Sequence, residues 1–163
     1  MSIDTSLTEV YNYSAAELIT LLRKKDISPL ELVDASIERI RHTDDKLNAM
    51  PTLCIDRARA HAKEIMRSES CNRTDEAWLG GIPISVKDLV AVKGVRTTWG
   101  SPIYENHIPD KSDILVERLE SNGAIIIGKS NTPEFGAGAN TFNEVFGKTY
   151  NPWNTKKTCG GSS

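Results

Sequence analysis

The stretch GAIIIGKS, residues 123–130, fits the nucleotide-binding pattern G-x-x-x-x-G-K-[ST], in which the lysine and the hydroxyl serve phosphate and magnesium. Such a loop works because free backbone N–H groups point at phosphate oxygens. Between the two glycines lies the run Ile125–Ile127, whose β-branched side chains favour a buried strand with its N–H groups bonded to neighbouring strands. We therefore predict a buried strand over residues 124–128 and no nucleotide at Lys129.

Two further segments carry residues that could do chemistry: GGIPISVKD at 80–88 and TCGGSS at 158–163. Each has an ordinary structural explanation. A lysine beside an aspartate, as in Lys87-Asp88, is usually a solvated ion pair, and Gly-Gly-Ser-Ser has the composition of a flexible linker. Taken alone, these residues favour the structural explanations over catalysis.

Thiol and metal chemistry are not indicated. Cys54, Cys71 and Cys159 are odd in number and widely separated, which argues against a disulfide framework and against C-x-x-C sites and fits a reducing cytosol. Cys54 and His61 would share a face of one predicted helix and need no catalytic explanation. With 3 histidines in the chain, the sequence assembles no zinc constellation, so we expect no metal.

Size and charge narrow the function further. A chain of 163 residues predicts one domain, and a net charge of −2 lacks the basic excess of a nucleic-acid-binding surface. No apolar run is long enough to span a bilayer, and the start MSIDTSLTEVYNYS lacks the pattern of a signal peptide. These features predict a cytoplasmic protein without nucleic-acid partners.

The first half of the sequence predicts helices. Ser14 with Glu17 forms a capping box before a helix over about 15–25, and Ser28-Pro29-Leu30-Glu31 repeats the signal before a second helix. A third helix is predicted over 52–67, followed by a polar surface loop, SESCNRTDE.

The second half changes to short apolar runs separated by glycine, which is typical of strands and crossovers. We predict a strand over 82–86, a long irregular segment over 93–110, a helix over 112–121 stopped at Gly123, and the strand over 124–128. This is a β-α-β unit, for which a right-handed crossover is expected. A nucleotide-binding loop requires the reverse order, with a strand before the first glycine and a helix after the lysine.

Taken in order, four segments resemble the amidase signature family of serine hydrolases: SAAELITLLRKKDISPLELVDASIERI, GGIPISVKDLVAVKGVRTTWGS, GAIIIGKSNTPEFG and NEVFGKTYNPWNTKKTCGGSS. The resemblance implies an α/β fold with N-terminal helices, followed by the beginning of the mixed, mainly parallel sheet of an α/β/α core. Residues 1–163 would then form the N-terminal part of a single amidase domain. Within that part, 1–78 would be a helical lead-in and 79–163 the start of the core, and the chain would be a fragment of a longer protein.

In that family a Ser-Ser-Lys triad is catalytic, and the resemblance assigns the lysine to Lys87 and the bridging serine, usually preceded by a cis peptide bond, to Ser162. A lysine acts as a base only when neutral, and burial lowers the pKa of an amine. The nucleophilic serine would follow roughly two dozen residues later, in a turn whose N–H groups form the oxyanion hole. Ser163 and Gly136 would contact substrate, and Cys159 stands where members often carry proline.

The implied reaction is hydrolysis of a small-molecule carboxylic amide through an acyl-serine intermediate, without a cofactor, by a protein that could form a homodimer at full length. One alternative is the glutamine-hydrolysing subunit of a tRNA-dependent amidotransferase. Thr132-Pro133-Glu134-Phe135-Gly136 favours a stand-alone amidase, because that subunit tends to have aspartate at the position of Pro133. A second alternative is a non-catalytic interaction protein built on half an amidase.

Overall fold

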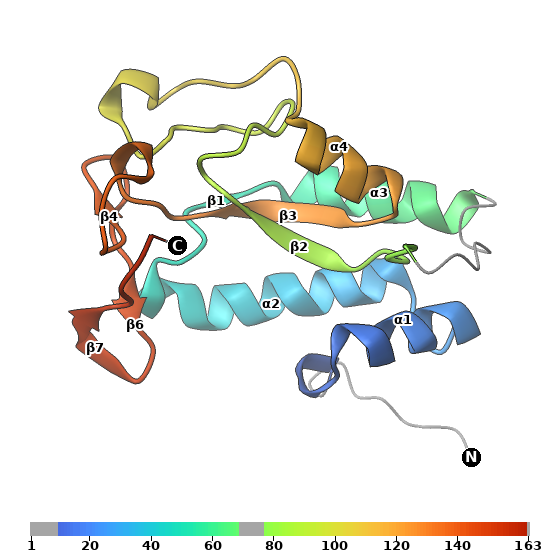
Figure 1. Cartoon of the computed structure of the whole chain (residues 1–163). Coiled ribbons are helices and arrows are strands. Elements are labelled where there is room, and N and C mark those ends of the chain that lie inside the picture. The colour runs from blue at the N-terminus through green and yellow to red at the C-terminus, as the bar shows by residue number, and fades with distance from the viewer. Residues whose placement is uncertain (1–9, 69–76, 163) are drawn as a thin grey trace. The chain divides into compact units, whose positions relative to one another are not determined.

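The computed structural model describes residues 10–68 and 77–162 (Figure 1). The helices are α1 (Ala15–Lys24), α2 (Pro29–Leu47), α3 (Ile55–Arg67) and α4 (Ile114–Ser121), with 3-10 turns η1 (Val10–Asn12), η3 (Pro102–Tyr104) and η4 (Glu134–Gly136). The strands are β1 (Thr52–Leu53), β2 (Pro83–Lys87), β3 (Ile125–Ser130), β4 (Phe142–Asn143), β5 (Gly147–Lys148), β6 (Tyr150–Asn151) and β7 (Asn154–Thr158). The fold class is α/β, as predicted.

Both predicted capping boxes are confirmed. At the start of α1, the Ser14 hydroxyl accepts from the Glu17 N–H at 3.3 Å and the Glu17 carboxylate accepts from the Ser14 N–H at 2.7 Å. Ser28 and Glu31 make the same reciprocal contacts at the start of α2. These hydrogen bonds lower the pKa of both glutamates, because they stabilise the charged carboxylate.

The predicted start of the third helix is wrong. Thr52 and Leu53 form β1 and pair antiparallel with Lys129 and Gly128 of β3. This long-range pairing overrides the local helical pattern, so α3 begins at Ile55 and Cys54 lies outside it. The fourth helix likewise begins two residues later than predicted, at Ile114. The predicted loop falls mainly on residues 69–76, outside the described residues.

The central sheet has the strand order β1-β3-β2. Ile125 N–H bonds to the Ile82 carbonyl at one end of the β2–β3 pair, and Asp88 N–H bonds to the Ser130 carbonyl at the other, so the two strands run parallel. The sheet is therefore mixed. The run Ile125–Ile127 is buried, which confirms the buried strand predicted from its β-branched side chains.

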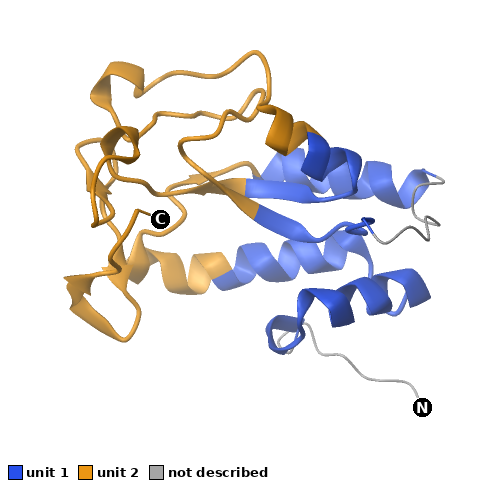
Figure 2. Ribbon diagram, in the orientation of Figure 1, with its two compact units in different colours: residues 1–39, 55–84, 118–127 blue, residues 40–54, 85–117, 128–163 orange. Residues whose placement is uncertain are grey.

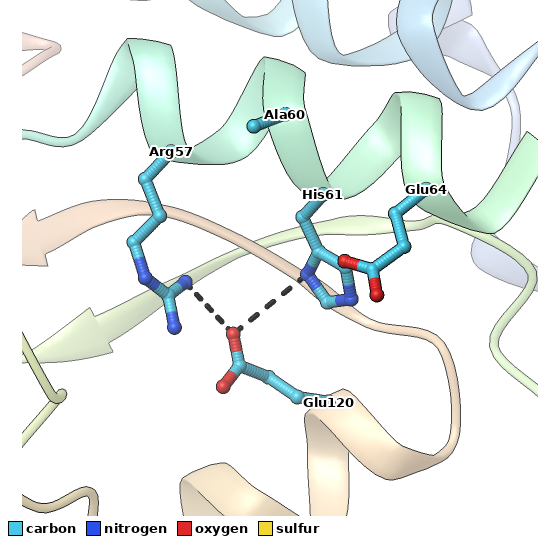
Figure 3. Close-up of a pocket in the computed structure, with 5 residues that line it drawn as sticks. All are labelled: Arg57, Ala60, His61, Glu64 and Glu120. Atoms are coloured by element: carbon cyan, nitrogen blue, oxygen red, sulfur yellow. Dashed lines mark ion pairs between the residues drawn. The ribbon is translucent and has the colours of Figure 1, made fainter.

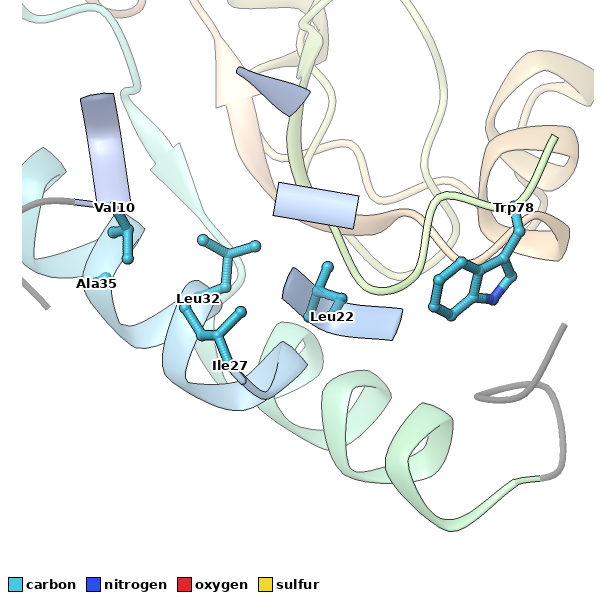
Figure 4. Packing of buried hydrophobic residues seen from close by; sticks show 6 residues of the cluster. All are labelled: Val10, Leu22, Ile27, Leu32, Ala35 and Trp78. Carbon is cyan, nitrogen blue, oxygen red and sulfur yellow. The ribbon is translucent and has the colours of Figure 1, made fainter. Parts of the chain in front are cut away.

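The chain divides into two compact units: residues 1–39, 55–84 and 118–127, and residues 40–54, 85–117 and 128–163 (Figure 2). The first unit contains an apolar cluster made by Val10, Leu22, Ile27, Leu32, Ala35 and Trp78 (Figure 4). In the described residues, the buried polar or charged side chains all belong to the second unit: Asp88, Thr97, Thr98, Ser101, Lys129, Asn131, Thr132, Thr141, Asn143 and Thr149. The buried groups capable of chemistry therefore lie in the second unit.

None of the helices in the described part of the chain is both long and apolar enough to cross a membrane.

Candidate active site

Lys87 is the last residue of β2 and is partly buried. A turn follows it at once, closed by the Val90 N–H, which donates to the Lys87 carbonyl at 3.0 Å. The Trp99 N–H donates to the Asp88 carbonyl, and the Trp99 indole N–H donates to the Leu89 carbonyl, both at 3.0 Å. The backbone of Lys87 is thus fixed by strand β2 before it and by the hydrogen-bonded turn after it.

The segment Cys159–Ser162 follows β7 and is held by two backbone hydrogen bonds. Cys159 N–H donates to the Thr149 carbonyl at 3.1 Å, and Thr141 N–H donates to the Gly160 carbonyl at 2.7 Å. Gly161 lies so close to this backbone that a Cβ there would be 3.0 Å from the Asn140 carbonyl carbon. Close packing therefore explains Gly161, and a left-handed φ of 85° explains Gly160.

The structure brings Lys87 and Ser162 together. Lys87 Nζ lies 2.8 Å from Ser162 Oγ, at hydrogen-bonding distance, although the two residues are 75 positions apart in sequence. The peptide bond between Gly161 and Ser162 is cis. Ser163, which the sequence suggested as a substrate contact, lies outside the described residues.

Gly136, the other suggested substrate contact, ends η4 and has a left-handed φ of 73°. A Cβ at this position would lie 2.7 Å from Leu89 Cδ1, so Gly136 packs against the turn that follows Lys87. The preceding Phe135 N–H donates to the Trp99 carbonyl at 2.7 Å. The TPEFG segment is therefore tied to the same turn as the lysine.

The expectation that Lys87 and Asp88 form a solvated ion pair is wrong. Asp88 is 0% exposed and its Oδ1 lies 3.4 Å from Nζ of Lys129, which is also 0% exposed. The Asp88 carboxylate therefore pairs with Lys129 and not with its neighbour in sequence. Because Lys129 is buried, it presents no cation to a phosphate, in line with the prediction that no nucleotide binds there.

Burial lowers the pKa of the Lys129 ammonium below its ordinary value, and the negative charge of Asp88 opposes that shift. Lys129 Nζ also donates to the Val90 carbonyl at 2.7 Å and to Thr97 Oγ1 at 2.9 Å. Asp88 Oδ2 accepts from the Thr98 N–H at 3.1 Å and from the Thr98 hydroxyl at 2.6 Å. Sequence reasoning missed this pair, because strand spacing alone does not say which lysine is buried.

A group of amide side chains, also missed from sequence, supports the segments around the loop. Asn143 Nδ2 donates to Asn131 Oδ1 at 2.8 Å and to the Thr132 carbonyl at 2.7 Å. Asn131 Nδ2 donates to Thr149 Oγ1 at 3.1 Å, and the Thr149 hydroxyl donates to the Asn48 carbonyl at 2.6 Å. Asparagine offers both donors and acceptors, which suits irregular backbone with few regular partners.

Two pockets lie in different units, and none of the predicted site residues in the described part of the chain lines either of them. A pocket of 290 Å³ in the second unit is lined by residues of the 133–144 segment, among them Pro133 and Asn143. A pocket of 370 Å³ in the first unit holds Arg57, His61 and Glu120 and none of the predicted site residues (Figure 3). There His61 Nδ1 lies 3.8 Å from Glu120 Oε1, and Arg57 Nη1 lies 2.8 Å from the same oxygen. His61 thus lies beside the ion pair of Arg57 and Glu120, in a pocket lined by none of the predicted site residues that the structure describes.

Comparison with known proteins places these features in a family. The sequence model described as Amidase matches residues 31–163. Over 140 residues, or 85% of this chain, it is 47% identical to a glutamyl-tRNA(Gln) amidotransferase subunit of Anaeromyxobacter dehalogenans (strain 2CP-C), of which it covers 28%. It is 39% identical to the protein of the same name from Thermoanaerobacter pseudethanolicus (strain ATCC 33223 / 39E), over 95% of this chain and 31% of that protein.

Solved structures agree with this result. A bacterial aryl acylamidase of the amidase signature enzymes superposes with a TM-score of 0.82 at 31% identity, over 93% of this chain and 31% of that one. Fatty acid amide hydrolase superposes with a TM-score of 0.86 over 98% of this chain and 28% of that one, and at 24% identity it supports the fold alone. The chain spans less than a third of the length of these relatives. It belongs to the amidase signature family.

Proposed function

We propose that this chain supplies the lysine and the bridging serine of an amide hydrolase that releases ammonia or an amine through an acyl-serine intermediate. The observation that supports the proposal most directly is the 2.8 Å contact between Lys87 Nζ and Ser162 Oγ. A neutral Lys87 amine accepts the proton of the Ser162 hydroxyl, and Ser162 in turn accepts the proton of the attacking hydroxyl.

The attacking serine belongs to the same proposal. We place it roughly two dozen residues after Ser162, in a turn whose N–H groups stabilise the oxyanion. Residues 1–163 then form the N-terminal part of one amidase domain, with 1–78 as its helical lead-in and 79–163 as the start of its core. We assign Gly136 and Ser163 to the substrate site, and we place the protein in the cytoplasm as a homodimer at full length without a cofactor.

Two candidates share this chemistry. The stand-alone amidase is supported by the Thr132-Pro133-Glu134-Phe135-Gly136 segment, which has proline where the amidotransferase subunit tends to have aspartate. The glutamine-hydrolysing subunit is supported by relatives named as subunits of glutamyl-tRNA(Gln) amidotransferase, at up to 47% identity. A stand-alone enzyme hydrolyses simple amides by itself, whereas the subunit requires glutamine, partner subunits and a charged tRNA.

The test measures ammonia release by the natural full-length protein on a panel of aliphatic and aromatic amides and on glutamine. Lys87→Ala and Ser162→Ala should each lower kcat severely with smaller effects on KM, since both groups act in the transition state. Two matched controls are available in exposed residues: Lys93→Ala and Ser85→Ala should leave the rates unchanged. A full-length enzyme indifferent to Lys87→Ala would refute the assignment.

The same experiment separates the alternatives. Turnover of simple amides without other subunits supports the stand-alone enzyme, and turnover of glutamine that appears only with partner subunits supports the amidotransferase. For a non-catalytic half-amidase, the coding sequence would carry a stop directly after the Ser163 codon. Codons that continue with Gly-Gly-Ser would favour a fragment of a longer amidase.

A further inference from the structure

Lys129 is the largest side chain in the described residues that is fully buried, and the proposed reaction does not use it. It is also the lysine of the GAIIIGKS stretch, which the sequence first offered as a phosphate ligand. A buried ion pair is commonly no more stabilising than apolar residues of the same volume. Stability alone is therefore a weak reason for a cation at this position.

The contacts of Lys129 converge on the turn that follows Lys87. The Lys129 ammonium donates to the Val90 carbonyl at 2.7 Å and to Thr97 Oγ1 at 2.9 Å, and it forms an ion pair with Asp88 Oδ1 at 3.4 Å. Asp88 and Val90 are the second and fourth residues of the turn closed by the Val90 N–H on the Lys87 carbonyl. Lys129 thus bridges two residues of that turn.

The remaining polar groups of the turn are fixed from other directions. Asp88 N–H donates to the Ser130 carbonyl, which continues the pairing between β2 and β3 beyond Lys87. Asp88 Oδ2 accepts two bonds from Thr98, whose hydroxyl oxygen also accepts from the Gly100 N–H at 3.0 Å. Among the hydrogen bonds of the described residues, the Val90 carbonyl accepts from Lys129 alone. If Lys129 were lost, no other side chain would hold this carbonyl in place.

We infer that Lys129, together with Asp88, is a positioning residue of the proposed amidase: it fixes the turn at residues 87–90 so that Lys87 Nζ stays within hydrogen-bonding distance of Ser162 Oγ. The inference rests on the proposed function, because it gives the lysine pair a role in that reaction. Because its side chain is 0% exposed, Lys129 acts on the proposed reaction through the backbone that carries Lys87.

The test uses the natural full-length protein with Asp88→Asn, Lys129→Met and the double variant. Each single variant leaves one buried charge without its partner and should lower the melting temperature. The double variant removes both charges at nearly constant volume and should recover much of that loss. Its kcat should nevertheless stay about 100-fold below wild type. The Val90 carbonyl no longer accepts a hydrogen bond from residue 129, so the turn no longer holds Lys87 in place.

A readout independent of activity is amide hydrogen exchange at Val90, whose N–H closes the turn. We expect faster exchange there in the double variant than in wild type. Lys93→Met removes an exposed lysine from the same segment of the chain and should change neither exchange nor kcat.

The outcomes separate the two ideas. Unchanged exchange at Val90 overturns the claim that Lys129 fixes the turn, whatever the activity. If the double variant exchanges faster at Val90 but keeps a wild-type kcat, or if its kcat recovers together with its stability, then Asp88 and Lys129 have a purely structural role. Either outcome overturns the positioning role. Full activity in Lys87→Ala overturns the proposed function, and the positioning role falls with it, while exchange at Val90 still decides whether Lys129 fixes the turn. Faster exchange with a lowered kcat in a stable double variant supports the inference.

Discussion

At the scale of single residues, Lys87 and Lys129 both lie at or next to the end of a strand, but their environments differ. Lys87 is partly buried and its ammonium reaches the Ser162 hydroxyl, whereas Lys129 is fully buried and its ammonium is surrounded by protein acceptors. Burying a charge is costly, and the cost is offset only when the group is paired and hydrogen-bonded. Lys129 meets that condition through Asp88, Val90 and Thr97.

The buried lysine predicts a pH dependence of stability. Burial lowers the pKa of Lys129, so the unfolded chain keeps this proton to higher pH than the folded chain. Since stability rises with pH wherever the unfolded state binds more protons, the free energy of unfolding should increase between the lowered pKa and the ordinary value of 10.5. Below the lowered pKa, both states hold the proton and this contribution is constant.

Urea unfolding of the wild type and of the Asp88→Asn/Lys129→Met double variant, repeated between about pH 7 and about pH 10, isolates this effect. The difference in unfolding free energy between the two proteins should shift in favour of wild type as the pH rises. A difference that moves in favour of the double variant would contradict the assigned environment of Lys129.

At the scale of elements, the start of α2 shows how a local signal fixes a helix boundary. Ser28→Ala removes the side chain that accepts from the Glu31 N–H at 3.2 Å and donates to the Glu31 carboxylate at 2.7 Å. The substitution should destabilise the protein by about 1 kcal/mol at neutral pH. Ser36→Ala in the same helix is the control: its hydroxyl bonds the Leu32 carbonyl, a contact that contributes little to helix stability.

The capping box also has a pH signature. Because the folded-state pKa of Glu31 is lowered from 4.5, its contribution is complete above that value and is lost as the pH falls through the folded pKa. Thermal melts at neutral and acidic pH measure this directly. The gap between wild type and Ser28→Ala should narrow in acid, and a gap that widens would rule out the charged carboxylate as the partner of Ser28.

Strand pairing predicts that a substitution at Gly128 strongly destabilises the protein. A Cβ at this position would lie 2.5 Å from the Thr52 carbonyl oxygen, so Gly128→Ala forces β1 and β3 apart and should cost about 3 kcal/mol. At Gly94 a Cβ meets no atom within 4 Å, and only the left-handed φ of 73° opposes alanine. Gly94→Ala should therefore cost about 1 kcal/mol. Chemical denaturation of both variants measures the two costs, and equal costs would contradict the close approach of β1 to β3.

At the scale of the whole molecule, local signals predicted most of the fold and only part of the site. Capping boxes and the isoleucine run of β3 act through neighbouring residues, so α1, α2 and β3 were predictable from the sequence. The strand at Thr52–Leu53 depends on pairing with residues more than 70 positions away and was predicted as helix. The same limit applies to Asp88, whose partner in sequence is Lys87 and whose partner in space is Lys129.

The distribution of apolar surface gives the last prediction. Most of the large hydrophobic side chains that are exposed in the described residues belong to the second unit: Ile103, Tyr104, Ile108, Ile114, Leu115, Phe135, Phe142 and Trp153. Trp153 is 91% exposed and Ile103 78%. Tyr104 and Phe135 lie next to each other, with ring centroids 6.2 Å apart. Contiguous exposed apolar side chains usually mark surfaces that contact other protein. The chain spans 28% of its relative from Anaeromyxobacter dehalogenans (strain 2CP-C), so the remaining length of such a protein is the partner we expect here.

Residues 1–163 produced alone should therefore associate and bind a hydrophobic dye such as ANS. They should also show no amide hydrolysis, because the proposed nucleophile and its oxyanion donors are not among them. The natural full-length protein should bind less dye per molecule. Size-exclusion chromatography and dye fluorescence at matched concentrations test the first expectation, with Trp153→Ser and Ile103→Ser as variants that should reduce both association and dye binding. A monomer of residues 1–163 with a sharp, high-temperature melt and no dye binding would contradict the expectation that these side chains are buried against the rest of a longer protein. Amide turnover by that chain, unaffected by Lys87→Ala, would show that the proposed mechanism is wrong.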